Sequence, residues 1–182
     1  MLEKLEKEVL NCKKCSLCEG RTNTVFGDGN PNASIMIIGE APGKNEDLEG
    51  LPFVGKAGKY LNELLSLAGL NREDVYIANV LKCRPPTNRN PHADEILQCA
   101  PYLRQQTTLI DPKIIVTLGN FATRFILKSE KGITLLHGQS IRRGKFIVYP
   151  VFHPASTMYD PKKKKSLEQD FKNLKSLICK QL

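Results

Sequence analysis

Several features that would place this chain in other protein classes are missing from its 182 residues. It has no low-complexity tract, and no apolar run approaches the roughly 20 residues of a membrane-spanning helix. Residues 1–7 are charged where a secretory signal would turn apolar, so we expect a cytoplasmic protein without a membrane partner. The chain also lacks a G-x-x-x-x-G-K-[ST] phosphate loop and a dinucleotide-binding glycine fingerprint, which argues against an enzyme of free nucleotides.

Length and composition are those of one globular domain. Domains usually contain about 100 to 200 residues, so a single domain over residues 1–182 is expected. The composition is 41% hydrophobic and 25% charged, which allows a buried core. Lysine and arginine number 27 against 19 aspartate and glutamate, and the net charge of +8 favours a polyanionic partner such as nucleic acid. A well-solvated surface could carry the same excess of positive charge, so charge alone does not establish nucleic acid as the partner.

The cysteines suggest a metal site. They are Cys12, Cys15, Cys18, Cys83, Cys99 and Cys179. Without an export signal they are expected to stay reduced, where thiols usually serve metal binding or catalysis. The C-x-x-C pair at Cys12 and Cys15, together with distant Cys83 and Cys99, supplies four soft ligands for zinc or a 4Fe-4S cluster. The 15 residues between the second pair do not match a zinc-ribbon knuckle and favour a cluster, with buried unligated thiols as the alternative. The other two cysteines are expected to be spare.

Hydrophobic patterning predicts alternating strands and helices. Continuous β-prone runs predict buried strands at 33–38, 75–80, 113–118 and 146–152. Helical periodicity predicts helices at 2–10, 55–68, 93–107, 121–127 and 163–182, with a hairpin-like excursion over 133–145. This alternation indicates an α/β fold with a mostly parallel sheet covered by helices on both faces.

Polar side chains follow the ends of three predicted strands. Glu40 follows the first, Asn79 ends the second, and His153 follows the fourth. Ligands of such sheets bind outside the carboxyl ends of the strands, so these three residues are expected to share one site. The alternative is that each residue only forms a turn.

Four motifs, taken in order with the cysteines, resemble those of the family 4 uracil-DNA glycosylases. They are Gly39–Gly43, Pro52–Gly55, Asn79–Pro86 and His153–Ala155. The resemblance implies a three-layer α/β/α fold around a four-stranded, mostly parallel sheet. It also implies a structural 4Fe-4S cluster on the four cysteines named above, and hydrolytic excision of uracil from DNA in base excision repair.

The resemblance assigns roles to residues of the expected site. His153 would donate a hydrogen bond to uracil O2 as negative charge develops on the departing base. Asn79 can donate to O4 and accept from N3–H, a pattern that cytosine reverses. Phe53 would stack on the extruded base, although it could equally be ordinary core. Gly39, Ala41 and Gly43 would line the same pocket.

Two carboxylates, Glu40 and Glu46, are candidates for roles close to the reacting nucleotide. Glu40 is the expected catalytic residue that orients water or stabilises the cationic sugar. Many uracil glycosylases of other families carry an aspartate where this chain has Ala41, so their aspartate mechanism does not transfer. Glu46 is the second candidate, and the resemblance places it near uracil C5, where thymine carries its methyl group. A solvated surface acid is the alternative for Glu46.

The expected partner is single- or double-stranded DNA that contains uracil, with a replication sliding clamp as a further candidate and a monomeric chain. A base inside a duplex must be extruded, and the segment 153–159 is where related enzymes insert a loop. Several basic residues are candidates for phosphate contacts: Lys162–Lys165, Arg84, Arg89, Arg142 and Arg143. A nucleic-acid-binding module without catalysis is the main rival, and it leaves the three polar residues at the strand ends unexplained.

Overall fold

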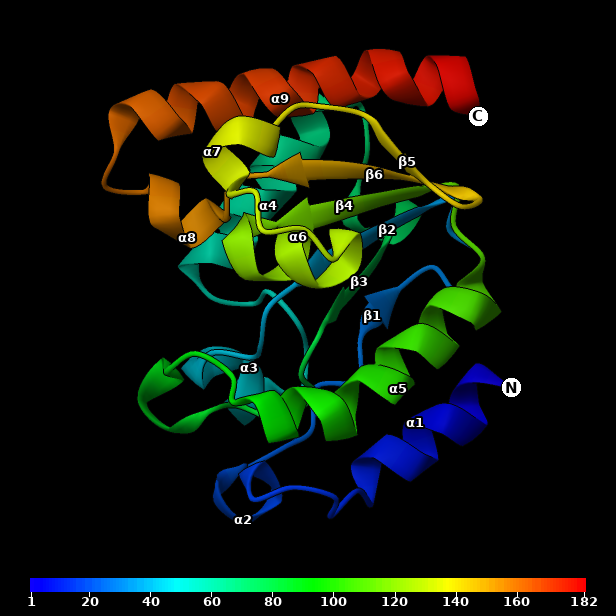
Figure 1. The fold of residues 1–182 in the computed structure, drawn as a ribbon, viewed down its shortest axis with the longest axis vertical. Coiled ribbons are helices and arrows are strands. Elements are labelled where there is room, and N and C mark those ends of the chain that lie inside the picture. The colour runs from blue at the N-terminus through cyan, green and yellow to red at the C-terminus, as the bar shows by residue number, and fades with distance from the viewer.

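The computed structural model describes all 182 residues, and a six-stranded sheet forms the centre of the molecule (Figure 1). The strand order is β1-β3-β2-β4-β6-β5. The strands are β1 (Asp28–Gly29), β2 (Ile35–Gly39), β3 (Tyr76–Asn79), β4 (Ile114–Leu118), β5 (Ile141–Arg143) and β6 (Phe146–Val151). The inner four pair in parallel, which confirms the four predicted strands. Their carboxyl ends therefore meet at one edge.

The two outer strands go beyond the four-stranded prediction. β1 has two residues and pairs antiparallel with β3, while β5 pairs antiparallel with β6. The β5–β6 pair forms a hairpin closed at Gly144 and Lys145, between the paired residues Arg143 and Phe146, whereas the excursion expected over 133–145 begins with a short helix at Ile133–Leu136. Strand β1 is too short to produce an alternation of apolar residues, so sequence patterning could not find it.

The side chains of successive β2 residues pack into two separate hydrophobic cores. Ile35 and Ile37 belong to the larger cluster, whereas Met36 and Ile38 belong to a second cluster on the other face. Side chains alternate between the two faces of a strand, so a strand buried on both faces must be apolar at every position. This is why the parallel strands appear in the sequence as unbroken apolar runs.

Helices cover both faces of the sheet. The larger core lies under α4 (Lys56–Leu67) and α9 (Pro161–Gln181), which pack against each other. On the opposite face lie α1 (Leu2–Leu10), α5 (Ala93–Ile110) and α6 (Gly119–Leu127). The predicted three-layer α/β/α arrangement is thus confirmed. No helix combines the length and the apolar character needed to cross a membrane.

The long predicted helices are present, with ends that differ by a few residues. Helix α9 begins at Pro161 because the Asp160 carboxylate accepts hydrogen bonds from the backbone N–H groups of Lys162 and Lys163, both 3.1 Å long. Short elements were not predicted, since one turn shows no periodicity. They are α2 (Leu17–Gly20), α3 (Lys44–Glu49), α7 (Ile133–Leu136), α8 (Pro154–Thr157) and the 3₁₀ turns η1 (Arg72–Asp74) and η2 (Pro86–Asn88).

Candidate active site

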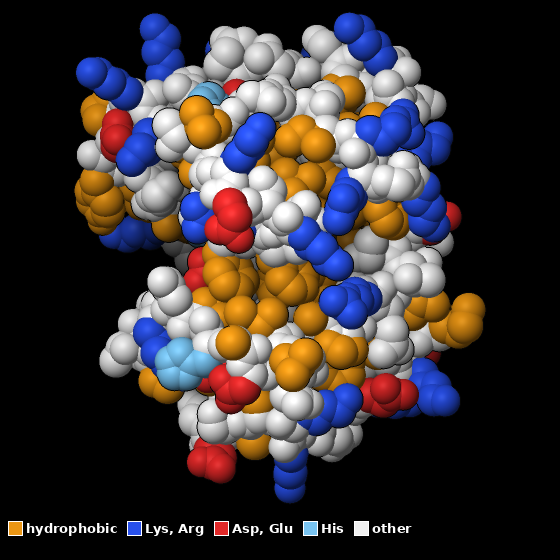
Figure 2. Space-filling view, viewed as in Figure 1, with side chains coloured by type: hydrophobic (Ala, Val, Ile, Leu, Met, Phe, Trp, Pro, Cys, Tyr) orange, Lys and Arg blue, Asp and Glu red, His pale blue; other side chains and the backbone are white.

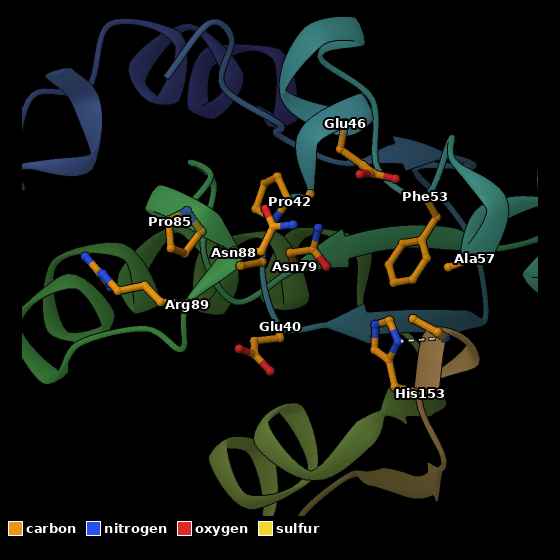
Figure 3. A pocket seen from close by; sticks show the side chains of 13 residues that line it. Glu40, Pro42, Glu46, Phe53, Ala57, Asn79, Pro85, Asn88, Arg89 and His153 are labelled. Carbon is orange, nitrogen blue, oxygen red and sulfur yellow. Dashed lines mark hydrogen bonds between the residues drawn. The ribbon is translucent and has the colours of Figure 1, made fainter. Parts of the chain in front are cut away.

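A cavity of about 370 Å³ opens at the carboxyl ends of the parallel strands, where the sequence predicted a shared site. Figure 3 shows Glu40, Asn79 and His153 facing this space from β2, β3 and the end of β6. Its lining residues are Glu40, Ala41, Pro42, Gly43, Glu46, Phe53, Ala57, Asn79, Pro85, Asn88, Arg89, His153 and Ala155. The volume lies in the range of small-molecule sites.

Asn79 presents a buried acceptor without a partner. The residue is 2% exposed, and its Oδ1 atom makes no hydrogen bond within the protein. An unpaired buried carbonyl costs roughly 1–3 kcal/mol, so a site that keeps one is expected to receive a donor from a ligand. Gly39 lies directly beside it, because a Cβ there would stand 2.3 Å from this oxygen and 2.7 Å from Phe53 Cζ. Only glycine leaves room for both side chains.

Phe53 forms one wall of the cavity from an unusual backbone conformation. Its φ angle is +53°, in the left-handed region that costs a non-glycine residue about 1–3 kcal/mol. Arg72 of η1 donates hydrogen bonds to the carbonyls of Phe53, at 3.2 Å, and Pro52. The Arg72 Nε atom also pairs with Asp28 Oδ2 at 3.2 Å. On the other side Gly58 of α4 lies so close that a Cβ would come within 1.8 Å of the Phe53 carbonyl oxygen.

Glu46 holds the residues after Phe53. Its Oε1 atom accepts hydrogen bonds from the backbone N–H groups of Val54, at 3.0 Å, and Gly55, at 3.3 Å. The carboxylate is therefore engaged with the loop while it lines the cavity, unlike the freely solvated acid considered from the sequence. The adjacent Asp47 is buried and accepts hydrogen bonds from the N–H groups of Thr22 and Asn23, which fixes helix α3 to the N-terminal segment.

His153 is neutral, and the position of its proton follows from one hydrogen bond. Burial lowers the pKa of His153 to about 4, against an opposing influence of the Glu46 carboxylate. The Nδ1 atom accepts a hydrogen bond from the Ala155 backbone N–H at 3.1 Å. In a neutral imidazole the other nitrogen must then carry the proton, so Nε2–H is a hydrogen-bond donor. The ring lies 5.7 Å from the Phe53 ring, centroid to centroid.

Glu40 makes no side-chain hydrogen bond within the protein, and burial raises its pKa. Its carboxylate lines both the main cavity and an adjoining one, which it shares with His153. A carboxylate without a protein partner at the edge of a cavity is free to bind water or a ligand.

The loop containing η2 contributes Asn88, which the sequence did not indicate, and Arg89 to the lining of the cavity. Asn88 adopts a left-handed φ of +55° and accepts a hydrogen bond from Arg84 Nε at 2.8 Å. Arg89 forms two hydrogen bonds with the buried Glu95 carboxylate, 2.9 and 2.5 Å long. This pairing gives Arg89 a structural partner, in contrast to the free phosphate ligand considered from the sequence. Three further lining residues, Pro42, Pro85 and Ala155, lie within the motifs named from the sequence, although no role was predicted for them.

Arg142 and Arg143 do not lie near this cavity. They pair with Ile147 and Phe146 at the start of β6, whereas His153 follows the end of that strand. The prediction that they add to a DNA-binding surface around the site is therefore wrong. The hairpin reverses the chain and carries both arginines to the opposite edge of the sheet.

The face beside the cavity carries exposed apolar and basic side chains. After α8, Met158 and Tyr159 are 38% and 89% exposed. Lys164 of α9 lies over the Tyr60 ring, 5.3 Å from its centroid, and both residues line a surface hollow together with Met158. Lys163 pairs with Asp160 at 3.3 Å.

Five cysteines come together at a second location. A small cavity is lined by Cys12, Cys15, Cys18, Cys83 and Cys99. The four predicted ligands thus meet, Cys18 joins them unexpectedly, and Cys179 is exposed on α9. No group of three or more His, Cys, Asp or Glu side chains converges on a point as the ligands of one ion would.

The surroundings of these thiols fit sulfur ligands that carry negative charge. Arg21 donates a hydrogen bond to Cys83 Sγ at 3.3 Å, and the Lys82 backbone N–H donates to Cys99 Sγ at 3.2 Å. Burial raises the pKa of the Cys83 thiol and raises that of Cys99 to about 11, which disfavours the free thiolates, while Arg21 and Lys82 act in the opposite direction. Cationic and N–H donors around sulfur are the usual outer partners of metal-bound thiolates.

The chain is similar in sequence to known uracil-DNA glycosylases. The sequence model of the uracil DNA glycosylase superfamily matches residues 26–175. A Type-4 uracil-DNA glycosylase of Sulfurisphaera tokodaii is 49% identical, over 97% of this chain and 84% of the relative. Those of Archaeoglobus fulgidus and Thermotoga maritima are 45% and 40% identical, over 98% and 100% of this chain and 94% and 96% of the relatives.

Proposed function

The chain belongs to the uracil-DNA glycosylase superfamily and excises uracil in DNA repair, and we propose that the cavity at Asn79 binds the extruded base. The observation that carries this proposal is the buried Asn79 Oδ1 atom without a partner, in a cavity that the Phe53 ring and the His153 imidazole also line. The reaction breaks the bond between deoxyribose C1′ and uracil N1. The bonding electrons leave with the base, a water oxygen bonds to C1′, and the proton that this water loses restores neutral uracil.

Asn79 selects uracil through its amide. The Oδ1 atom accepts the hydrogen bond of N3–H, and the amide nitrogen donates to O4. Cytosine carries an acceptor at N3 and a donor at its 4-amino group, so both contacts become mismatched. Leaving such groups unpaired in a buried site costs enough to reject the wrong base by several orders of magnitude. The Lys82 ammonium, 2.9 Å from the Asn79 carbonyl oxygen, holds the backbone of this residue in place.

His153 stabilises the departing base. With Nδ1 engaged by the Ala155 N–H, the Nε2–H group is the donor available to uracil O2. A neutral donor whose orientation is already set needs no reorganisation when charge develops on O2. Removal of one such donor typically lowers the rate about a hundredfold to a thousandfold.

Glu40 is the proposed partner of water and of the cationic sugar. Glu46 already accepts two backbone N–H groups, whereas the Glu40 carboxylate has no protein hydrogen bond. The proposed role of Glu46 is to hold the loop that carries Phe53 and to border uracil C5. Neither role needs an aspartate at position 41.

Access to the cavity requires base extrusion. Met158 and Tyr159 are exposed beside the hollow that Lys56, Lys59 and Lys164 also line. We assign the two apolar side chains to the space left in the base stack and the lysines to the flanking phosphates. These contacts offset the few kcal/mol that unstacking costs.

We propose that the second cavity is the site of a 4Fe-4S cluster, with Cys12, Cys15, Cys83 and Cys99 as its ligands. Four irons spread their thiolates around a volume, as these cysteines are spread around a cavity. The cluster would join the N-terminal segment to α5 and would take no part in bond breaking. Cys18 lines the same cavity and is the one alternative ligand. The sliding clamp, the monomeric state and the cytoplasmic location stay predictions from the sequence.

One experiment tests the base-binding proposal. Oligonucleotides with a single uracil, thymine or cytosine are incubated with the protein, and abasic sites are cleaved with alkali. We expect cleavage at uracil alone in the wild type, and a measurable rate at cytosine in Asn79→Asp. An Asn79→Asp variant with unchanged selectivity would show that the cavity does not read the base in this way.

A further inference from the structure

The largest of the main cavities is lined by none of the residues that line the uracil cavity. It is a groove of about 760 Å³ between α5 and α6, against 370 Å³ for the uracil cavity. Figure 2 shows this face with a hollow that exposes apolar side chains between two bulging halves of the surface. The apolar lining residues are Leu103, Ile115, Phe125, Ile126, Phe146 and Val148. An apolar hollow of this size on a protein surface usually marks an interaction site.

The rim of the groove is basic. Arg104, Arg124, Lys128 and Arg143 line it, and no acidic residue does. None of the four takes part in an ion pair within the protein, and Figure 2 shows blue side chains around the hollow. Arg143, which does not line the uracil cavity, is thus one of the basic residues of this groove. An apolar floor with uncompensated positive charge around it is complementary to an apolar segment flanked by carboxylates.

The position of the groove indicates the shape of that segment. Parallel sheets are normally covered by helices on both faces. Here α6 has only nine residues and ends beside Lys128, so space remains between it and the second half of α5 over β4 and β6. An amphipathic helix that places apolar residues at positions i, i+3, i+4 and i+7 in such a space uses a known mode of recognition.

We propose that this groove, lined by α5, α6 and the β5–β6 hairpin, binds an acidic amphipathic helix of a partner protein. The partner's apolar face lies on Phe125, Ile126 and Phe146, and its carboxylates face Arg104, Lys128 and Arg143. DNA is the rival occupant, because a basic rim with phenylalanines also suits single strands. The helix is favoured because the groove lies toward the amino ends of β4 and β6, whereas the uracil cavity opens at their carboxyl ends.

The test uses three fluorescein-labelled probes and measures fluorescence anisotropy with the whole protein. The first is a peptide of about 16 residues, more than four helical turns, with Leu or Phe at the i, i+3, i+4, i+7 positions and Glu elsewhere. The second carries Lys in place of every Glu. The third is a thymine-only oligonucleotide of similar length. The groove variant is Arg104→Glu, Lys128→Glu, Arg143→Glu, and the control is Lys172→Glu, Lys175→Glu, Lys180→Glu, which changes exposed lysines of α9 by the same total charge.

We expect the acidic peptide to bind the wild type and the control alike, and to bind the groove variant roughly tenfold to a hundredfold more weakly. The lysine peptide should show the reverse preference, which also verifies that the groove variant is folded. Failure of the acidic peptide to bind the wild type, or equal weakening in the control, overturns the proposal. Oligonucleotide binding that depends on the groove residues while the acidic peptide does not bind would assign the groove to DNA instead. Uracil excision by the groove variant should stay within about threefold of wild type, which keeps this proposal separate from that for the active site.

Discussion

Replacement of Arg72 by alanine should weaken uracil binding, although Arg72 does not line the base-binding cavity. Its guanidinium donates to the carbonyls of Pro52 and Phe53 and pairs with Asp28. These contacts hold Phe53 at a φ of +53°, which presents its ring to the base. Without them the chain can return to an ordinary conformation, and the ring would leave the wall of the cavity.

The size of the effect follows from two opposing quantities. A left-handed φ at phenylalanine costs about 1–3 kcal/mol. A hydrogen bond from a charged donor contributes about 1.5–3 kcal/mol when buried, and the Arg72 side chain, 25% exposed, lies toward the low end. The two bonds therefore just offset the strain, and their loss frees Phe53. Binding of the base must then supply the roughly 1–3 kcal/mol of this strain, which lowers kcat/KM about fivefold to 150-fold.

Steady-state kinetics on an oligonucleotide with one uracil can measure this effect. Stacking acts on the bound base as well as on the transition state, so KM should rise more than kcat falls. Inhibition by free uracil should weaken in parallel. Arg72→Lys should recover only part of the lost kcat/KM, because lysine lacks the planar, forked guanidinium that donates to both carbonyls. Arg142→Ala, which removes an exposed arginine at the far edge of the sheet, is the matched control.

A purely structural role for Arg72 makes a different prediction. In that case the melting temperature would fall while KM and the inhibition constant of uracil stayed at their wild-type values. That combination would refute the argument that Arg72 positions Phe53.

Further predictions concern the site and the cysteines. Asn79→Asp should excise cytosine measurably in the alkali cleavage assay, because a protonated carboxyl can donate to N3. His153→Ala should lower kcat about a hundredfold to a thousandfold with little change in KM, as measured by single-turnover excision. Since the pKa of His153 is lowered to about 4, the excision rate should show no inflection at the ordinary histidine pKa of about 6.5. The free energy of unfolding should decrease as the pH falls from 6.5 toward 4. A rate inflection near 6.5 would contradict the assignment of a neutral His153. Cys83→Ala should abolish the visible absorbance of a bound cluster and lower the melting temperature, and a stable, fully coloured variant would exclude Cys83 as a ligand.

Much of the fold could be predicted from the sequence because it rests on local patterns. The parallel strands are apolar at every position, since both of their faces are buried, and the long helices repeat their apolar residues each turn. The edge where the strands end collects Glu40, Asn79 and His153, and the topology of a parallel sheet requires this. Short elements such as β1 and η2 have too few residues to show any period, so the sequence did not predict them.

The tertiary structure alone decided how these residues are held. Arg72 reaches Phe53 across 19 positions, and Arg21 reaches Cys83 across 62. Such pairs depend on where the chain reverses, and no spacing rule in the sequence connects them. The proton on His153 Nε2 likewise follows from the hydrogen bond that Nδ1 accepts from the Ala155 N–H, a contact that forms only in the folded chain. The groove between α5 and α6 arises from the length and placement of two helices that meet only in the folded chain. The sequence by itself therefore determined which chemistry the chain carries, and packing between distant segments decided the geometry in which it acts.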